Sequence, residues 1–402
     1  MNTSSNPHTG ALSGLKVLDL SRFIAGPYCA MLLGDMGADV VKVETPGKGE
    51  NSRSFHPQFG GESIYSMVVN RNKRGMTLNF RSEQGQAVLR DLISKADVVI
   101  ENFVPGTLEK MGCGWKEMHQ LNPRLVMTRI SGFKSTGPYA NKPCFDVVAQ
   151  AMSGLMDLTG QPDGPPTAAG VFLVDYATAM YATIGTLGAI QHQSRTGEGQ
   201  LVEATLMSSA LSMLMTAIPE QILFNRTPTR MGTRDRFNAP GNTFKAADGS
   251  WILLITVGDD KFRALAQCMN REDLLANPQF STNDARMRNV SEIEAIVQEW
   301  TGQHSVDELV LKLEEIGIPC AKVNTIANVV TDRNVIESEL LMQQPQRGGD
   351  VPLQGFPFGM NATPPVLRHS APSIGEHTDE VLREWLDFSP EAIAAYRASN
   401  AI

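Results

Sequence analysis

The sequence predicts an α/β protein that has a large domain with a mostly parallel sheet and a smaller α+β domain. Short apolar segments alternate with helical patterns through its first half. Residues 15–20 and 38–44 have the composition of strands, and Gly26-Pro27 begins a helical pattern at 28–36 between them. Such βαβ alternation is typical of a parallel sheet covered by helices on both faces.

The same pattern continues to about residue 130. We expect strands at 76–80, 97–101 and 125–130, a helix at 83–95, and a pair of helices before the last of these strands.

The chain changes character from about residue 241. Asp248-Gly249 separates two apolar segments, 242–245 and 251–257, which is a strong hairpin signal. Helical patterns follow to about residue 330, so this region predicts the smaller domain. Residues 339–369 are rich in Pro and Gly and indicate a linker, whereas 379–399 has the period of one amphipathic helix.

Composition and charge exclude several classes of function. The 402 residues include 35 Lys and Arg against 43 Asp and Glu, a net charge of −8, which argues against a broad nucleic-acid-binding face. The polar start predicts no secretory signal, and residues 204–223 predict a buried helix, not a membrane span. Five scattered cysteines suit a reducing cytoplasm, and the histidine spacing predicts no metal site.

Asp175 is the principal candidate for chemistry. Residues 171–174 are apolar and predict a strand, while Met180, Ile184 and Leu187 have helical spacing, so Asp175 is expected at a strand-to-helix junction. An ordinary helix cap is the commonest role of an aspartate there. The functional alternative is a carboxylate kept ionised by helix-end amides at the sheet edge where ligands bind.

A carboxylate at such an edge suits the transfer of coenzyme A between acids. It can attack a thioester carbonyl to give a mixed anhydride and a free thiolate. A hydrolase would instead need an activated Ser or Cys with a His base, and the sequence has no GxSxG elbow and no recognisable cysteine nucleophile motif.

Eight motifs in order carry a family resemblance across nearly the whole chain. They are residues 15–27, 33–44 (LGDMGADVVKVE), 72–74, 99–106 (VIENFVPG), 121–124, 145–155 (FDVVAQAMSGL), 160–175 and 375–382 (GEHTDEVL). The sequence resembles the class III coenzyme A-transferases, the family of the formyl-CoA and carnitine CoA-transferases. Succinyl-CoA is a common donor among bacterial members.

The resemblance implies a Rossmann-like large domain built from both chain ends, and an interlocked homodimer of two ring-shaped subunits. The expected division of the chain is 10–205 for the first part of the large domain, 206–228 for a linker, 229–338 for the small domain, 339–369 for a second linker, and 370–402 for the return to the large domain.

The resemblance also assigns the site. The nucleophile falls on Asp175, with Asp146 close to it and acting either as a tuning or positioning group or as an ordinary helix cap. Since two neighbouring carboxylates resist joint ionisation, one should have a raised pKa. The expected CoA contacts are Ile24, Ala25, Leu78, Asn79, Phe80, Arg81, Asn102, Phe103, Lys110, Pro143, Cys144 and Phe145. No metal and no permanently bound cofactor are expected.

The implied reaction moves coenzyme A from an acyl-CoA, with succinyl-CoA as the expected donor, to a small carboxylic or dicarboxylic acid or an isostere such as a sulfinate. It passes through an aspartyl mixed anhydride and an enzyme–CoA thioester. Arg230, Arg234 and Arg236 are candidates for recognising a second acid group, the alternative being a solvated or salt-bridged loop.

Two departures from the formyl-CoA transferase pattern stand out. Pro46 replaces an arginine, so that Lys48 and Arg53 are the nearest cations, and the covering glycine-rich loop is reduced to the short, charged segment 257–261. Both departures weaken the case for oxalate or formate as the substrate.

Two other functions compete with CoA transfer. An α-methylacyl-CoA racemase would carry a histidine where this chain has Phe145, and glycines where Tyr176-Ala177-Thr178 follow the aspartate. Phenylalanine cannot move a proton, which disfavours the racemase. A non-catalytic acyl-CoA-binding protein is the other alternative, and passage of label from an acyl-CoA to a free acid would exclude it.

Overall fold

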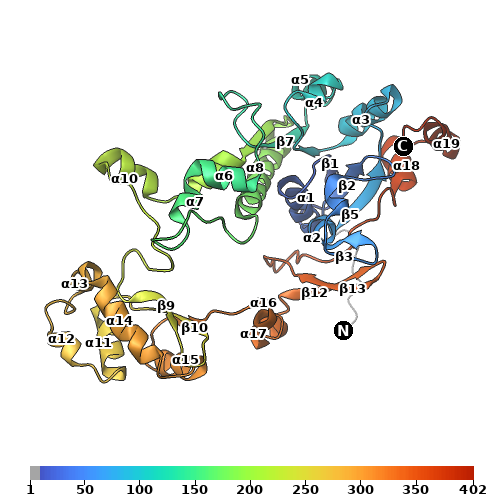
Figure 1. Cartoon of the computed structure of the whole chain (residues 1–402). Coiled ribbons are helices and arrows are strands. Elements are labelled where there is room, and N and C mark those ends of the chain that lie inside the picture. Colours follow the sequence, from blue (N-terminus) through green and yellow to red (C-terminus); the bar gives the residue numbers. More distant parts are fainter. Residues whose placement is uncertain (1–9) are drawn as a thin grey trace. The chain divides into compact units, whose positions relative to one another are not determined.

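The computed structural model describes residues 10–402, which form two compact units (Figure 1). The large unit comprises the described residues up to Leu155 together with Ala168–Pro219 and Glu337–Ile402. The small unit comprises Met156–Thr167 and Glu220–Ile336. Both ends of the described chain therefore belong to the large unit.

A six-stranded parallel sheet forms the centre of the large unit, in agreement with the predicted fold class. Its strands, in spatial order, are β5 (Lys73–Thr77), β2 (Asp39–Glu44), β1 (Lys16–Asp19), β6 (Val98–Glu101), β7 (Val126–Ser131) and β8 (Leu201–Thr205). Successive residues of β1 face opposite sides, because Val17 belongs to one apolar core and Leu18 to another. Burial on both faces explains the nearly continuous apolar character of these strands.

Helices cover both faces of this sheet. One core includes residues of α1 (Ala25–Asp35) and α8 (Leu173–Thr196), and the opposite core includes residues of α3 (Glu83–Lys95), α5 (Trp115–Leu121) and α18 (Thr378–Leu386). The other helical elements of this unit are η1 (Asn51–Ser54), α2 (Ile64–Asn70), α4 (Thr107–Lys110), α6 (Asp146–Ser153), α9 (Leu206–Ser212) and α19 (Pro390–Ala398). Two short hairpins complete it, β3 (Gln58–Phe59) with β4 (Glu62–Ser63) and β12 (Leu341–Gln346) with β13 (Gly349–Gln354).

The small unit is built on a three-stranded antiparallel sheet. The hairpin predicted at Asp248-Gly249 is present and joins β9 (Gly241–Lys245) to β10 (Trp251–Ile255), which also pairs with β11 (Cys320–Lys322). The helices that follow β10 are α11 (Asp259–Cys268), α12 (Asp273–Ala276), α13 (Asn283–Arg288), α14 (Val290–Thr301), α15 (Val306–Glu315) and α16 (Ile326–Val329). Three helices cross the boundaries between the units, α7 (Leu155–Leu158), α10 (Ala217–Phe224) and α17 (Arg333–Glu337).

Four local predictions were wrong. Residues 171–174 form no strand, because no neighbouring strand pairs with them and α8 already begins at Leu173. The expected linker 206–228 contains α9 and α10, and the expected linker 339–369 contains the hairpin of β12 and β13. A two-stranded ribbon tolerates its prolines because each strand has an unpaired edge. The terminal helix is two helices, since Asp387 has a left-handed φ of 56° and Pro390 begins α19.

The segment expected as one buried helix at 204–223 also differs. It contains the end of β8 and then α9 and α10, and Ile222 of α10 is 75% exposed. Among residues 10–402, no single helix is long and apolar enough to cross a membrane, while α9 and α10 together pass that test by length and composition as a bent pair.

A buried arginine organises the small unit. Arg286 is fully buried, and its guanidinium donates to the carbonyl oxygens of Ala239 at 2.6 Å and Phe280 at 3.0 Å. It also pairs with Asp259 at 2.9 Å and lies over the ring of Phe262 at 4.1 Å from the centroid. Two backbone carbonyls of this unit therefore depend on one side chain.

Arg286→Met should lower the free energy of unfolding of the small unit by about 2–5 kcal/mol, because two buried carbonyl groups lose their donors. Urea unfolding followed by the fluorescence of Trp251 and Trp300, which both belong to this unit, would measure the change. Arg271→Met removes an exposed ion pair to Asp273 and should leave the transition unchanged. Equal shifts in the two variants would contradict a special role of Arg286.

Candidate active site

One cavity of the large unit lies where three neighbouring strands end. Ile24 follows β1, Asn102 follows β6, and Gly132 follows β7, and all three line a cavity of about 330 Å³. The carboxyl ends of parallel strands meet at one edge of a sheet, and ligands bind there in open α/β folds. Asp175 also lines this cavity, so the principal candidate lies at the expected edge.

A second cavity adjoins the first. It has a volume of about 890 Å³ and shares four lining residues with the first cavity: Phe23, Asn102, Phe103 and Val104. Three cationic side chains line the second cavity, Arg22, Lys48 and Arg81. The pair of cavities thus offers a space that runs from a carboxylate to a group of cations, which fits a long ligand with phosphate groups at one end.

Most of the predicted ligand contacts line these two cavities. Those in the first cavity are Ile24, Ala25, Asn102, Phe103, Pro143, Cys144 and Phe145, and those in the second are Asn79, Phe80, Arg81, Asn102 and Phe103. Leu78 and Lys110 line neither cavity. Leu78 is fully buried, and its backbone N–H donates to the carbonyl of Glu44, which leaves little of this residue for a ligand.

Asp175 lies in the first turn of α8, and Asp146 holds the start of that helix. The residue before the helix, Phe172, provides no side-chain cap. The carboxylate of Asp146 instead accepts from the backbone N–H of Val174 at 2.7 Å and of Asp175 at 3.0 Å. Asp146 is 2% exposed and begins α6, so one buried carboxylate fixes the backbone of the candidate nucleophile from another helix.

This geometry refines the expectation for Asp146. As an ordinary cap it would serve its own helix, but α6 has no side-chain cap, and Asp146 caps α8. Its other oxygen accepts from the side-chain amide of Gln150, whose carbonyl oxygen accepts from the N–H of Ala169 at 2.9 Å. The segment that leads into α8 is therefore also held through Gln150.

Burial and the neighbouring charge of Asp146 raise the pKa of Asp175 to about 7. The helix-end amides, which were expected to keep Asp175 ionised, bind Asp146 instead, so that expectation was wrong. A carboxylate with a raised pKa is more basic than an exposed one and therefore a better nucleophile once it is deprotonated.

The side chain of Asn102 binds the backbone of a neighbouring loop that lines the cavities. Its side chain accepts from the backbone N–H of Arg22 and donates to the carbonyl of the same residue, both at 2.8 Å. The N–H of Phe103 donates to Glu101 at 2.9 Å. Asn102 and Phe103 were expected to contact coenzyme A, but the side-chain amide of Asn102 and the N–H of Phe103 are both engaged within the protein.

Several candidate cations are neutralised by ion pairs. Arg53 pairs with Glu44 at 2.6 Å, which leaves Lys48 as the cation near Pro46 that lines the second cavity. In the small unit, Arg230 pairs with Asp157 and Arg234 with Glu294, both at 2.6 Å, and Arg236 lies 4.0 Å from Glu220. These arginines therefore form the salt-bridged loop that was the alternative to acid recognition.

Two aromatic residues around the candidate site were missed from the sequence. Phe23 lines both cavities with a left-handed φ of 65°, a conformation that a phenylalanine does not signal. Tyr65 packs edge-on against Phe172 with 6.2 Å between ring centroids. Burial and the charge of Asp175 raise the pKa of Tyr65 well above its usual range, so its hydroxyl stays protonated near the candidate nucleophile.

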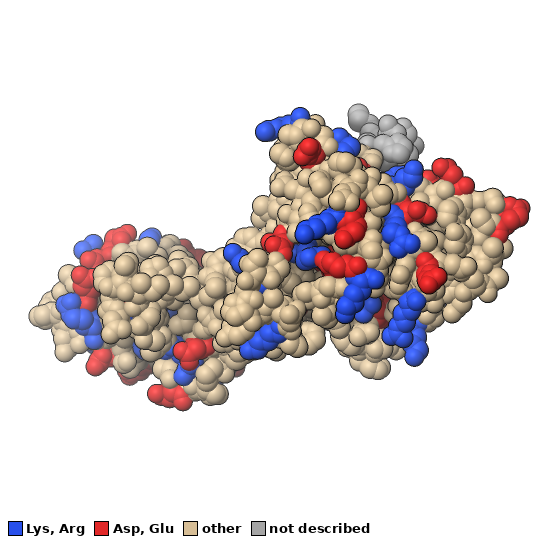
Figure 2. Space-filling view, turned by 90° about the horizontal axis from the view of Figure 1, so that it is seen from above, with Lys and Arg blue, Asp and Glu red and all other residues tan. Residues whose placement is uncertain are grey.

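The visible surface carries charges of both signs. Figure 2 shows Lys and Arg side chains interspersed with Asp and Glu over the face that it presents. Basic residues therefore do not dominate this face, as the net charge of −8 for the whole chain also suggests.

Comparisons with known proteins identify the family of the chain. The model of CoA-transferase family III matches residues 12–378. The chain is 35% identical over 394 residues to the succinyl-CoA–D-citramalate CoA-transferase of Chloroflexus aurantiacus, covering 97% of this chain and 98% of that protein. It is 38% identical over 388 residues to the succinyl-CoA:mesaconate CoA-transferase of Haloarcula marismortui, covering 93% and 96%.

A solved structure shows the same fold. The crystal structure of a CaiB/BaiF family protein from Brucella suis superimposes with a TM-score of 0.85 at 34% identity, covering 94% of this chain and 100% of that one. The cavities at the carboxyl edge of a parallel sheet, the match along almost the whole chain and these relatives lead to one conclusion: the protein is a CoA-transferase and belongs to CoA-transferase family III.

Proposed function

We propose that this enzyme moves coenzyme A from succinyl-CoA to a small dicarboxylic acid, with Asp175 as the covalent nucleophile. The observation that carries the proposal is the placement of Asp175, which among residues 10–402 is the only carboxylate lining the first cavity and is held at a helix start by Asp146. The names of the two relatives support the substrate class, since both pair succinyl-CoA with a dicarboxylic acid.

The chemistry proceeds in four balanced steps. The Asp175 carboxylate attacks the thioester carbonyl of succinyl-CoA, and the carbon–sulfur bond breaks to give a mixed anhydride and CoA thiolate. The thiolate attacks the aspartyl carbonyl, which forms an enzyme–CoA thioester and releases succinate. The acceptor carboxylate attacks that thioester and forms a second anhydride and thiolate. Attack of the thiolate on the acceptor carbonyl gives the new acyl-CoA and frees Asp175.

The two cavities suit these steps. The second cavity, with Arg22, Lys48 and Arg81, would take the phosphate end of coenzyme A, and the smaller first cavity would receive the thioester beside Asp175. A pKa of about 7 means that an appreciable fraction of Asp175 is ionised at neutral pH. The carboxylate is therefore available without a separate general base.

The racemase is disfavoured by the same cavities. Its reaction needs a base that moves a proton beside the thioester, and no histidine of the described part of the chain lines either cavity. Phe145, at the position where a racemase would carry its histidine, lines the first cavity and is 62% exposed.

Asp175→Asn and Asp175→Ala should reduce CoA transfer to below a few per cent of the wild-type rate, because an amide or a methyl group cannot form the anhydride. The measurement is transfer from succinyl-CoA to a panel of dicarboxylic, monocarboxylic and sulfinic acids. Hydroxylamine added during turnover should convert the acylated side chain to a hydroxamate, seen as a mass change on the peptide that contains Asp175. Near-normal transfer by either variant would refute the covalent role.

Asp146→Asn should shift the acid limb of the pH profile of kcat/KM to lower pH and also reduce turnover. The charge of Asp146 raises the pKa of Asp175, so its removal lets Asp175 ionise at lower pH. Only ionised Asp175 reacts, so kcat/KM of the wild type should rise as the pH increases through about 7. In the variant the same rise should occur at a lower pH. Glu391→Gln makes the same charge change on α19 and should leave the limb in place. An unmoved limb in Asp146→Asn would contradict the coupling.

The family resemblance further leads us to propose an interlocked homodimer. Interlocked rings separate only when one of them unfolds in part. A dilution series in sedimentation should therefore show dimer at every concentration, and dissociation should need denaturant. Folded monomer at low concentration would rule this assembly out.

A further inference from the structure

Residues 21–24, named here the pocket loop, join β1 to α1 and form a wall of both cavities. Phe23 lines both, Arg22 lines the second, and Ile24 lines the first. Phe23 has a left-handed conformation, with φ 65°, which is unfavourable for a residue with a side chain. Such a conformation persists only where the surroundings impose it.

Side chains hold Phe23 in this conformation, because the backbone groups of the pocket loop form few hydrogen bonds with other backbone groups. The N–H and the hydroxyl of Ser21 both donate to the carboxylate of Asp19, the former at 3.0 Å. The carbonyl of Ser21 accepts from the ammonium of Lys42. On the other side, a Cβ on Gly26 would lie only 2.2 Å from the Cβ of Ser21, so α1 packs directly against the loop.

The next two residues are held in the same way. Both backbone groups of Arg22 bind the side chain of Asn102. The N–H of Phe23 points to the carboxylate of Glu50 at 3.4 Å. Five consecutive polar groups of the backbone, from the N–H of Ser21 to the N–H of Phe23, are thus bound by side chains.

The side chains that bind the loop belong to a buried charge network. Asp19, Lys42 and Lys73 are all 0% exposed, and the ammonium of Lys73 donates at 2.8 Å to Asp19. Lys73 also donates to the carbonyl of Pro27 at 2.8 Å and to the side chain of Asn70 at 2.9 Å. Burial alone would raise the pKa of Asp19, but Lys42 and Lys73 hold it below its usual value.

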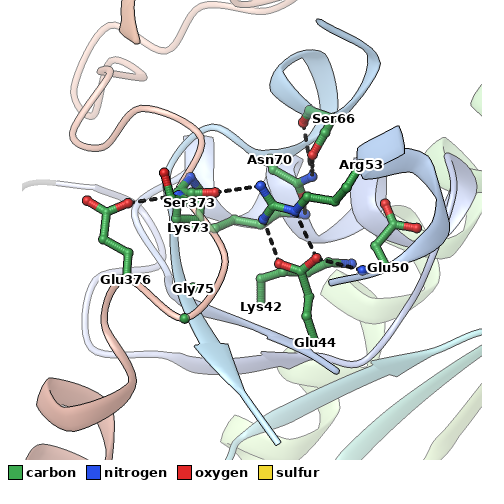
Figure 3. A network of polar contacts seen from close by, with 12 residues as sticks. Lys42, Glu44, Glu50, Arg53, Ser66, Asn70, Lys73, Gly75, Ser373 and Glu376 are labelled. Atoms are coloured by element: carbon green, nitrogen blue, oxygen red, sulfur yellow. Dashed lines mark hydrogen bonds and ion pairs between the residues drawn. The ribbon is translucent and has the colours of Figure 1, made fainter. Parts of the chain in front are cut away.

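Glu50 belongs to a second group of charged side chains, which interacts electrostatically with Lys42 through Glu44 (Figure 3). Glu44 binds Arg53 and accepts from the N–H of Glu50 at 3.0 Å, and Arg53 also donates to the carbonyl of Pro372 at 2.9 Å. The acids Asp19, Glu44 and Glu50 match the bases Lys42, Lys73 and Arg53 in number.

We infer that Lys42 and Glu50 are positioning residues, which hold the pocket loop in the shape that coenzyme A requires. The inference rests on the proposed function, because it concerns the same cavities. Neither side chain lines a cavity, so each acts through the loop backbone. The competing explanation is that the network only stabilises the fold.

A second buried ion pair provides a matched control. Arg71 and Asp35 lie 2.7 Å apart, with side chains 4% and 0% exposed, in the same unit. Arg71 also donates to the carbonyl of Gln354 at 2.9 Å, and neither partner contacts the pocket loop in any bond of the described residues. Loss of Arg71 should therefore cost stability without touching the site.

The test compares Lys42→Met with Arg71→Met. Both should lower the melting temperature, but only Lys42→Met should weaken binding of free coenzyme A, by about tenfold or more, as measured by calorimetry. Its KM for succinyl-CoA should rise accordingly, while Arg71→Met keeps both constants within about twofold. Equal effects of the two variants, or unchanged binding in Lys42→Met, would overturn the inference.

Glu50 gives a second pair of variants in case Lys42→Met does not fold. Glu50→Gln retains an oxygen that can accept from the N–H of Phe23, whereas Glu50→Ala removes it. The alanine variant should raise the Kd for coenzyme A, and the glutamine variant should restore most of the affinity. Equal Kd values for the two would also overturn the inference.

The binding measurement separates this inference from the proposed function, since it needs no turnover by Asp175. Wild-type protein that binds no coenzyme A would refute the proposed use of the cavities. Binding that is tight in the wild type and unchanged in the variants would refute only the role of the network.

Discussion

The carboxylate of Asp146 is the interaction on which the site depends. It is buried, it closes the start of α8 by accepting from two backbone N–H groups, and its charge acts on Asp175 in the first turn of that helix. One group therefore fixes the backbone of the candidate nucleophile and adds to the rise in its pKa that burial causes. A cap supplied by the helix's own N-terminal residue could fix the helix start, but it would not bring a second carboxylate to this position.

The sheet edge explains why these groups meet. Asp175 and the residues that follow β1, β6 and β7 are separated by up to about 150 positions in the sequence, yet all line one cavity. A parallel sheet brings the ends of its strands together, and the connections after them are free to carry polar and aromatic groups. The apolar strands supply rigidity, while the loops supply the chemistry.

Much of this was predictable from the sequence because apolar periodicity and family motifs are local signals. The parallel sheet and the hairpin at Asp248-Gly249 follow from such patterns. The error at 171–174 has a physical cause, since apolar residues before a helix look like a strand until pairing partners are known. The capping of α8 by Asp146 could not be predicted either, because it joins two helices whose contact is tertiary.

The loop conformations were least accessible from the sequence. Nothing in the identity of Phe23 indicates a left-handed φ, and nothing in that of Asn102 tells whether its amide serves a ligand or the backbone of Arg22. Both outcomes depend on bonds to residues far away in the chain. The arginines at 230, 234 and 236 were candidates for binding an acid group of the substrate. Their charges are instead paired with acidic side chains of the protein, which the sequence did not indicate.

The buried charge network beneath the pocket loop is costly as a source of stability alone. Moving ions from water into the interior costs several kcal/mol per ion, and well-packed apolar residues of similar volume often stabilise a fold as well or better. What apolar side chains cannot do is bind consecutive N–H and carbonyl groups of a loop that lacks strand or helix partners. Lys42 and Asp19 bind the two sides of Ser21, which an apolar pair would leave unsatisfied. The network thus holds the strained pocket loop in one conformation beside the cavities. The shape of the cavity wall is maintained at the expense of the free energy lost in desolvating the buried charges.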